Sequence, residues 1–199
     1  MKRLFAAILL PSDVESHLDG HVDAARAAHP ELRWVKPARW HVTCEFMGES
    51  GPHEVDRQLR RWEKRARRSM PLRLQLAGVG TFPKTWMAKV LWVGLGGDVE
   101  SWRKLAAYGN DPHLTLARTR QRTDLTGVVD ELLSYAGPAW TAEQVAVIES
   151  HLGGAPDGGP HYEVLEAFTL GRATTGDGID GSESDWQYSD EGPRRPSQP

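Results

Sequence analysis

Cysteine is nearly absent from this chain of 199 residues, which contains only Cys44. One cysteine cannot form an internal disulfide, and it excludes metal sites built from several thiolates. Long apolar runs are absent too. The run from Leu4 to Leu10 is far shorter than the roughly 20 residues of a membrane span, and it ends at Pro11 without a small-residue cleavage site. We therefore predict a buried first strand and a cytoplasmic protein without a membrane partner.

An excess of positive charge is also lacking. The chain has 24 Lys and Arg against 27 Asp and Glu, which gives a formal net charge of -3. Proteins that coat nucleic acids without sequence preference need many surplus cations to displace counterions. Any nucleic acid bound by this chain is therefore expected to be held locally, at an end.

Residues 39–48, with the sequence RWHVTCEFMG, form an apolar strand pattern that carries a His-x-Thr motif. Strand side chains alternate between two faces, so His41, Thr43 and Glu45 are predicted to share one face. The other face is predicted to enter the core through Val42, Cys44 and Phe46.

A second strand-like stretch, 111–118, repeats the motif with the sequence DPHLTLAR. His113 and Thr115 are predicted on one face, with Leu114 and Leu116 on the other. Arg118 lies five residues after His113, so regular alternation places it on the opposite face unless a bulge intervenes. Two such strands suggest two half-sites that face each other.

A pair of imidazoles has a definite chemical use. The ordinary histidine pKa near 6.5 allows one ring to be neutral and the other protonated at working pH, which provides a base and an acid without a metal. A threonine two residues along can donate a hydrogen bond to an oxygen on which negative charge grows. A single His-x-Thr carries little information, so the flanking sequence decides how far this interpretation holds.

The flanks resemble those of a known family. The matching stretches, in order along the chain, are LFAAILLP (4–11), RWVKP (33–37), WHVT (40–43), FMGE (46–49), GTFP (80–83), VLWV (90–93) and PHLTLAR (112–118). Together they resemble the 2H phosphoesterase superfamily, in particular the bacterial RNA 2',3'-cyclic phosphodiesterases, historically called 2'-5' RNA ligases. The resemblance covers about Lys2 to Arg172.

The resemblance implies an α+β fold of two pseudo-symmetric lobes, each an antiparallel sheet with outer helices, around a central cleft. It implies hydrolysis of 2',3'-cyclic phosphate ends of RNA or nucleotides to 2'-phosphomonoesters, without a cofactor, metal or obligatory protein partner, by a monomer. His41 is the implied proton donor and His113 the implied proton acceptor. Thr43, Thr115 and Arg118 are the implied phosphate-binding residues.

Three alternatives stay open at this stage. The same motifs would serve a 2'-5' RNA ligase or a 2'-5' phosphodiesterase, and a non-catalytic module that binds RNA ends could retain them. A metal-assisted hydrolase could use His41, His113 and Glu45 as ligands.

Glu45 stands where relatives often carry Lys or Arg, which predicts a less basic cleft, and the segment before His113 is shorter than in relatives.

The remaining pattern predicts helices and strands around these motifs. A helix is predicted over Ser12 to Ala28, opened by a capping box of Ser12 and Glu15. His17 and His21 on it are predicted to face solvent without a metal. A second helix starts at Pro52 and carries a basic outer face. Further elements are predicted at residues 72–77, 87–95, 98–107, 124–135, 144–152 and 162–170.

The composition divides the chain into two parts. Residues 1–172 are predicted to form the 2H phosphoesterase domain. Residues 173–199 are dominated by Gly, Ser, Asp, Glu and Pro and are predicted to be a disordered tail. Trp186 and Tyr188 in this tail are a weak candidate for a partner-binding peptide.

Overall fold

The computed structural model describes residues 1–106, 111–155 and 158–171. The predictions for the tail, including Trp186 and Tyr188, and for the short segment before His113 therefore lie wholly or largely outside the described residues. Within the described part of the chain, no helix is both long enough and apolar enough to cross a membrane.

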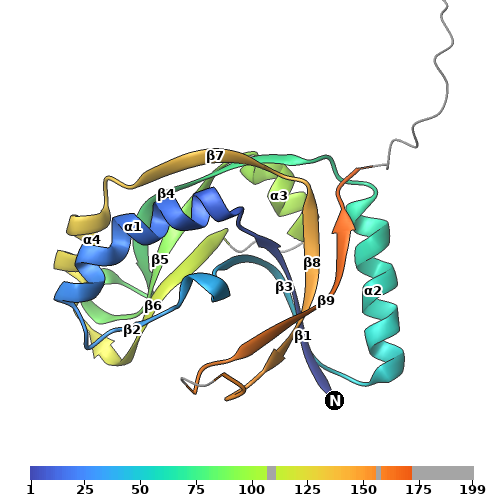
Figure 1. The fold of residues 1–199 in the computed structure, drawn as a ribbon, viewed down its shortest axis with the longest axis horizontal. Helices are drawn as coiled ribbons and strands as arrows, with labels where there is room; N and C mark the ends of the chain where they lie inside the picture. The colour runs from blue at the N-terminus through green and yellow to red at the C-terminus, as the bar shows by residue number, and fades with distance from the viewer. Residues whose placement is uncertain (107–110, 156–157, 172–199) are drawn as a thin grey trace, which may run out of the picture.

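The described residues form an α+β fold with two antiparallel sheets, as predicted (Figure 1). The first sheet has the strand order β3-β1-β8-β9 and the second has the order β2-β6-β5-β4-β7. In chain order the elements are β1 (Lys2–Leu9), α1 (Ser12–Ala28), β2 (Arg33–Trp34), the 3-10 turn η1 (Pro37–Arg39), β3 (His41–Ser50), α2 (Pro52–Ala66), β4 (Leu72–Phe82), η2 (Thr85–Met87), β5 (Ala88–Gly97), α3 (Val99–Ala106), β6 (His113–Thr123), α4 (Thr126–Leu132), β7 (Ala136–Ala142), β8 (Gln144–His151) and β9 (His161–Thr169).

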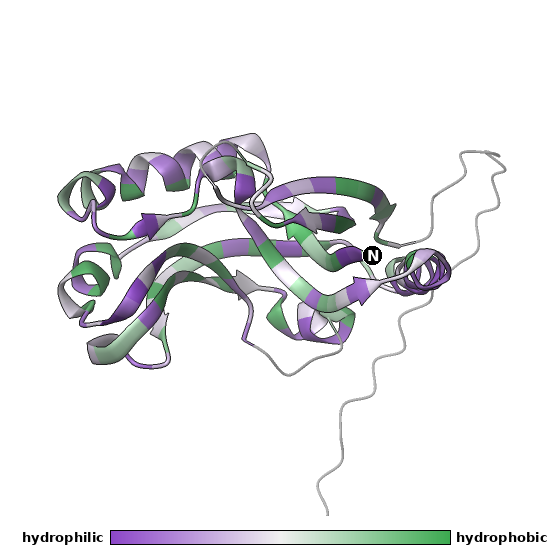
Figure 2. Ribbon diagram, turned by 90° about the horizontal axis from the view of Figure 1, so that it is seen from below, coloured by the Kyte–Doolittle hydropathy of each residue, from purple (hydrophilic) through white to green (hydrophobic). Residues whose placement is uncertain are grey.

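One hydrophobic core joins the two sheets. It contains Ile8 and Val42 from the first sheet and Leu74 and Leu114 from the second. Helix α2 packs on the first sheet, while α1 and α4 pack on the second. Helix α3 contacts β3 and β4, and so lies between the sheets. Figure 2 shows hydrophobic and hydrophilic residues alternating along the strands, as expected for sheets with one face in this core.

Helix α1 has the predicted bounds, but its predicted capping box is wrong. Pro11 occupies the N-cap position with extended backbone angles, and no side chain bonds the free amides there. Ser12 is therefore already the first helical residue, one position too late to act as the cap. Asp13 and Glu15 in the first turn still face the positive end of the helix dipole favourably.

In the second sheet, residues 78–80 bulge the strand that begins at Leu72, one of the two outcomes expected of these residues, and one further strand was not predicted. Strand β4 is continuous to Phe82, and the glycines after Ala77 bulge it without ending it; Gly78 has a φ of 69°, which suits glycine. Strand β7 was not predicted, because Gly137 and Pro138 interrupt its pattern. Among the described strands it pairs with β4 alone, at the edge of the sheet, where a proline is tolerated.

Candidate active site between the two sheets

Strands β3 and β6 repeat one burial pattern position for position. From His41 to Glu49 and from His113 to Gln121 the residues alternate in the same order between half-buried, buried and exposed. Each histidine is the first residue of its strand, and β3 and β6 contact each other although they belong to different sheets. The predicted half-sites therefore have the same local structure and lie together.

A bulge in β3 changes the faces predicted for the first motif. Thr43 lies opposite Ala7 and Glu45 lies opposite Ala6, so Cys44 is an extra residue in the strand. Regular alternation fails after it. The predicted placement of Glu45 beside His41 is therefore wrong, and so is the predicted burial of Phe46, which is 75% exposed.

Glu45 instead faces α2. Its side chain is 7% exposed, and its carboxylate accepts hydrogen bonds from Arg61 at 2.7 Å and Arg65 at 3.2 Å. These contacts take two cations of the basic helix face into an ion pair. They also remove from the site the carboxylate that a metal-assisted mechanism would have used with the two histidines.

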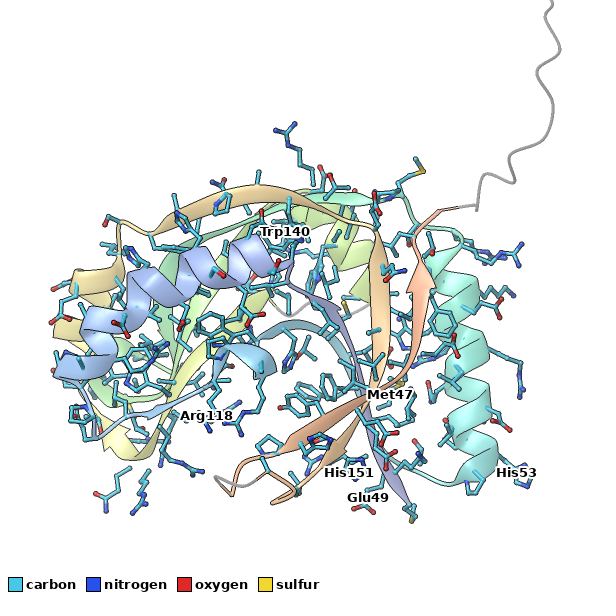
Figure 3. The ribbon with its side chains drawn as sticks, in the orientation of Figure 1. Met47, Glu49, His53, Arg118, Trp140 and His151 are labelled. Carbon is cyan, nitrogen blue, oxygen red and sulfur yellow. The ribbon has the colours of Figure 1, made fainter. Side chains whose placement is uncertain are left out.

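The equivalent bulge in β6 has the opposite consequence for Arg118. Thr115 lies opposite Trp92 and Ala117 lies opposite Leu91, so Leu116 is the extra residue. Arg118 is thereby returned to the face of His113 and Thr115, the condition under which a phosphate contact was predicted. Figure 3 shows Arg118 between β6 and the β8–β9 hairpin.

The two imidazoles are held by the same kind of hydrogen bond. Nδ1 of His41 lies 2.8 Å from the carbonyl oxygen of Arg39, and Nδ1 of His113 lies 2.9 Å from that of Asp111. A carbonyl only accepts, so each Nδ1 carries the proton. The two Nε2 atoms are then the positions that accept or donate a proton during a reaction.

Aromatic rings surround each imidazole. The centroid of the His41 ring lies 4.9 Å from that of Phe5 and 5.3 Å from that of Tyr162. The His113 ring lies 4.9 Å from Phe82, edge to face, and 6.3 Å from Trp92. These contacts hold the rings in place and exclude water from one side of each.

Charged residues of the second sheet affect the pKa of His41 in the first sheet. Burial lowers the pKa of His41; the hydrogen bond to the Arg39 carbonyl opposes this, and the positive charges of His113 and Arg118 lower the pKa further. Burial raises the pKa of Tyr162, against the charges of Arg118 and two other arginines. Arg118 therefore acts electrostatically on two residues of the opposite sheet.

One group among the described residues could hold a metal ion, and it lies elsewhere. Glu149, His151 and Glu163, on β8 and β9, have ligand atoms within 4.8 Å of one another. Glu149 is already bonded to Lys2. Tyr162, which contacts His41, neighbours Glu163 in the strand and so faces the other side of the sheet. The cluster is thus separated from the two histidines.

His17 and His21 also have protein partners. Nδ1 of His17 lies 3.3 Å from the hydroxyl oxygen of Tyr135, and the ring of His21 lies 4.7 Å from the ring of that tyrosine. The prediction that this pair faces solvent is therefore wrong for His21, which is half-buried.

Comparison with known proteins gives the class of protein that the sequence resemblance predicted, a phosphoesterase. The model of the LigT-like phosphoesterase family matches residues 8–92. An RNA 2',3'-cyclic phosphodiesterase of Thermus thermophilus is 33% identical over 84% of this chain and 90% of its own length. One of Methanothermobacter thermautotrophicus is 27% identical over 84% and 98%.

Solved structures give the same result. The protein TT0787 of Thermus thermophilus matches with a TM-score of 0.68 and 27% identity over 84% of this chain and 97% of its own. The chain belongs to the LigT-like family of 2H phosphoesterases. The resemblance and the fold predicted from the sequence are confirmed.

The structure brings together the two predicted histidines, with their threonines on the same strand faces, and Arg118. The prediction missed the aromatic shell of Phe5, Tyr162, Phe82 and Trp92. Three of these four lie in flanking stretches that carry the family resemblance, 4–11, 80–83 and 90–93. Tyr162 gave no such signal, because its strand is distant in sequence and carries no motif.

Proposed function

We propose that this chain hydrolyses 2',3'-cyclic phosphate ends of RNA or nucleotides to 2'-phosphomonoesters without a metal ion. The observation that carries the proposal is the equivalent mounting of His41 and His113. Each ring is bonded through Nδ1 to a main-chain carbonyl, and the two rings come from different sheets. The relatives named RNA 2',3'-cyclic phosphodiesterase support the choice of substrate.

The reaction is an in-line displacement at phosphorus. Nε2 of His113 takes a proton from water as the water oxygen bonds to phosphorus. The bond from phosphorus to O3' breaks, and Nε2 of protonated His41 gives its proton to O3'. The product keeps the phosphate on O2', and proton exchange with solvent restores the two rings.

The phosphate is held by groups on the same strand faces as the histidines. The hydroxyls of Thr43 and Thr115 donate to the non-bridging oxygens, on which charge grows in the transition state. Arg118 contributes a guanidinium, which binds phosphate oxygens in a fixed planar geometry. The bulge at Leu116 is what allows this third contact.

The proposal is tested with purified protein, 2',3'-cyclic nucleotides and EDTA. We expect turnover to the 2'-monophosphate, identified by chromatography against both monophosphate standards. Formation of the 3'-monophosphate, or turnover only after metal is added, would contradict it. Tight binding without turnover would favour a module that only binds RNA ends.

A further inference from the structure

Potential metal ligands gather on one face of the β8–β9 hairpin. In the register of this hairpin, Glu149 lies opposite Glu163 and His151 lies opposite His161. Strand residues two apart share a face, and the pairing is unbroken from Glu149 to His151, so all four side chains leave the sheet on the same side. Tyr162 lies between Glu163 and His161 in the chain and faces the other way, towards the candidate active site. The cluster is therefore a separate group of residues.

Three of the four side chains already converge. Nε2 of His151 lies 3.3 Å from Oε2 of Glu163 and 3.8 Å from Oε1 of Glu149, and the ligand atoms of the three residues all lie within 4.8 Å of one another. Ligands of a tetrahedral zinc ion, each about 2.0–2.2 Å from the metal, lie about 3.3–3.6 Å apart. The ring of His161 is next to the group, with its centroid 6.0 Å from that of His151. Figure 3 shows His151 on this hairpin. Small side-chain movements are therefore sufficient to surround an ion.

The charges of the cluster favour a cation. Glu149 and Glu163 lie directly opposite each other, and like charges in this arrangement destabilise a strand pair. Lys2 is bonded to Oε2 of Glu149, whereas Oε1 is the oxygen that lies towards His151. The two carboxylates outweigh this single lysine. Hydrogen bonds of this kind orient the carboxylates that bind metals. The Glu149 side chain is 9% exposed and that of Glu163 is 57% exposed, so the cluster is fixed at its inner end and open to solvent at its outer end.

We propose that Glu149, His151 and Glu163 bind one divalent transition-metal ion, with zinc as the best match, and that this ion ties β8 to β9. Zinc accepts histidine nitrogen and carboxylate oxygen in the same site, often with three protein ligands and a water. Magnesium and calcium prefer sites made of oxygen ligands. His161 or water takes the remaining position.

The bound ion stabilises an edge strand. Among the described strands, β9 pairs with β8 alone. An ion shared by Glu149 and Glu163 replaces the repulsion across this pair with attraction to a common charge. Tyr162, next to Glu163 on the opposite face, contacts His41, so the ion supports the strand that carries one member of the aromatic shell. The ion takes no part in the proposed hydrolysis, and this inference does not depend on that function.

The test uses the full chain, stripped of metal with EDTA and then freed of chelator. Zinc is titrated in competition with a chromophoric chelator, in buffer that contains excess magnesium. We expect one zinc ion per chain, and a rise of a few degrees in melting temperature, because a ligand that binds only the folded state stabilises it. His151→Ala and Glu163→Gln should each weaken zinc binding by at least about 100-fold, since even the outer hydrogen-bond partners of metal ligands contribute about 10- to 100-fold.

Two control variants separate this site from other histidines. H41A/H113A removes both imidazoles of the candidate active site and should keep the zinc affinity of the natural chain. H29A should also keep it, because the two ring nitrogens of His29 contact different carboxylates, those of Glu31 and Glu131, on opposite edges of the ring. Circular dichroism of each variant checks that it is folded.

The outcomes decide the proposal in either direction. Zinc affinity that is unchanged in His151→Ala and Glu163→Gln would overturn it, and so would loss of zinc binding in H41A/H113A. A natural chain that binds no zinc, or binds it only as weakly as magnesium, would overturn it as well. Turnover of 2',3'-cyclic nucleotides is measured separately, and its absence would count against the proposed function alone.

Discussion

Cys44 and Leu116 are structurally equivalent: each is the extra residue of a bulge three positions after a site histidine. Neither side chain touches substrate in the proposed reaction, and both are buried in the core. Their role is to shift the strand by one residue, so that the residue two places later returns to the face of the histidine.

Replacing either histidine should abolish most turnover. His41→Ala and His113→Ala are each expected to lower kcat on 2',3'-cyclic nucleotides by about 10² to 10⁴, the usual contribution of a positioned acid or base. His29→Ala is the matched control, because that ring pairs with Glu31 and Glu131 outside the site. Near-normal turnover in either site variant, with the control unchanged, would rule out the two-histidine mechanism.

The pH profile should be bell-shaped and insensitive to EDTA. The base is lost on the acid side and the acid on the alkaline side, and both limbs belong to the coupled pair. The two rings titrate as one coupled pair, so the acid limb marks the pH at which both rings are protonated. Burial lowers the pKa of His41 from 6.5, so both rings are protonated only at lower pH, and this limb of kcat/KM is expected below about pH 6.5. A chelator-sensitive plateau would point to a metal-bound water instead.

Removing the carboxylate beneath α2 should destabilise the fold. Glu45→Gln leaves Arg61 and Arg65 without their anion in a largely buried contact. A loss of about 1–3 kcal/mol in the free energy of unfolding is expected from urea titration. Glu54→Gln takes the carboxylate partner from the exposed Arg57 on the same helix and should change the unfolding midpoint much less. Equal effects of the two substitutions would show that burial of Glu45 is unimportant.

The thiol of Cys44 should be protected in the folded protein. Burial raises its pKa to about 12, so little thiolate exists at pH 8. Labelling by a thiol reagent in buffer is therefore expected to be slower than in denaturant by about three orders of magnitude or more. Rapid labelling without denaturant would mean that the core around Cys44 opens in the folded protein.

Truncation tests the predicted domain boundary. Deleting residues 173–199 is expected to leave turnover and the melting temperature nearly unchanged, because their composition offers little apolar surface to bury. The comparison is with the full chain under the same conditions. A drop of several degrees on truncation would place part of this segment in the folded domain.

The sequence was sufficient to predict the strands that carry the two histidines and their threonines, and most other helices and strands, because each depends on a local pattern. His41 and Thr43 are two residues apart on a strand, so their shared face follows from alternation alone. Glu45 and Phe46 lie beyond the bulge, and the sequence shows no residue that marks Cys44 as extra. The register depends on contacts with β1, which local alternation does not encode.

The aromatic shell and β7 were not predicted, for related reasons. Tyr162 reaches His41 because β8 pairs with β1 and β9 pairs with β8, which brings the end of the chain into the same sheet as β3. Pro138 made the sequence of β7 look unlike a strand, although a proline is tolerated at a sheet edge. The register between β7 and β4 is set by long-range pairing, which a local pattern does not show. Arg118 is intermediate between the predicted and the missed residues. The sequence showed that Arg118 needs a bulge to reach the face of His113, but it did not show that this bulge exists.

The two sheets are not the two halves of the chain. The first sheet takes β1 and β3 from the beginning and β8 and β9 from the end, whereas the second is built largely from the segment between them. A fragment ending at Thr123 would contain both motifs and still lack half of the sheet that supports His41. During synthesis, both histidines leave the ribosome well before the residues that complete this sheet. We therefore expect the candidate site to be complete only when β8 and β9 have been made.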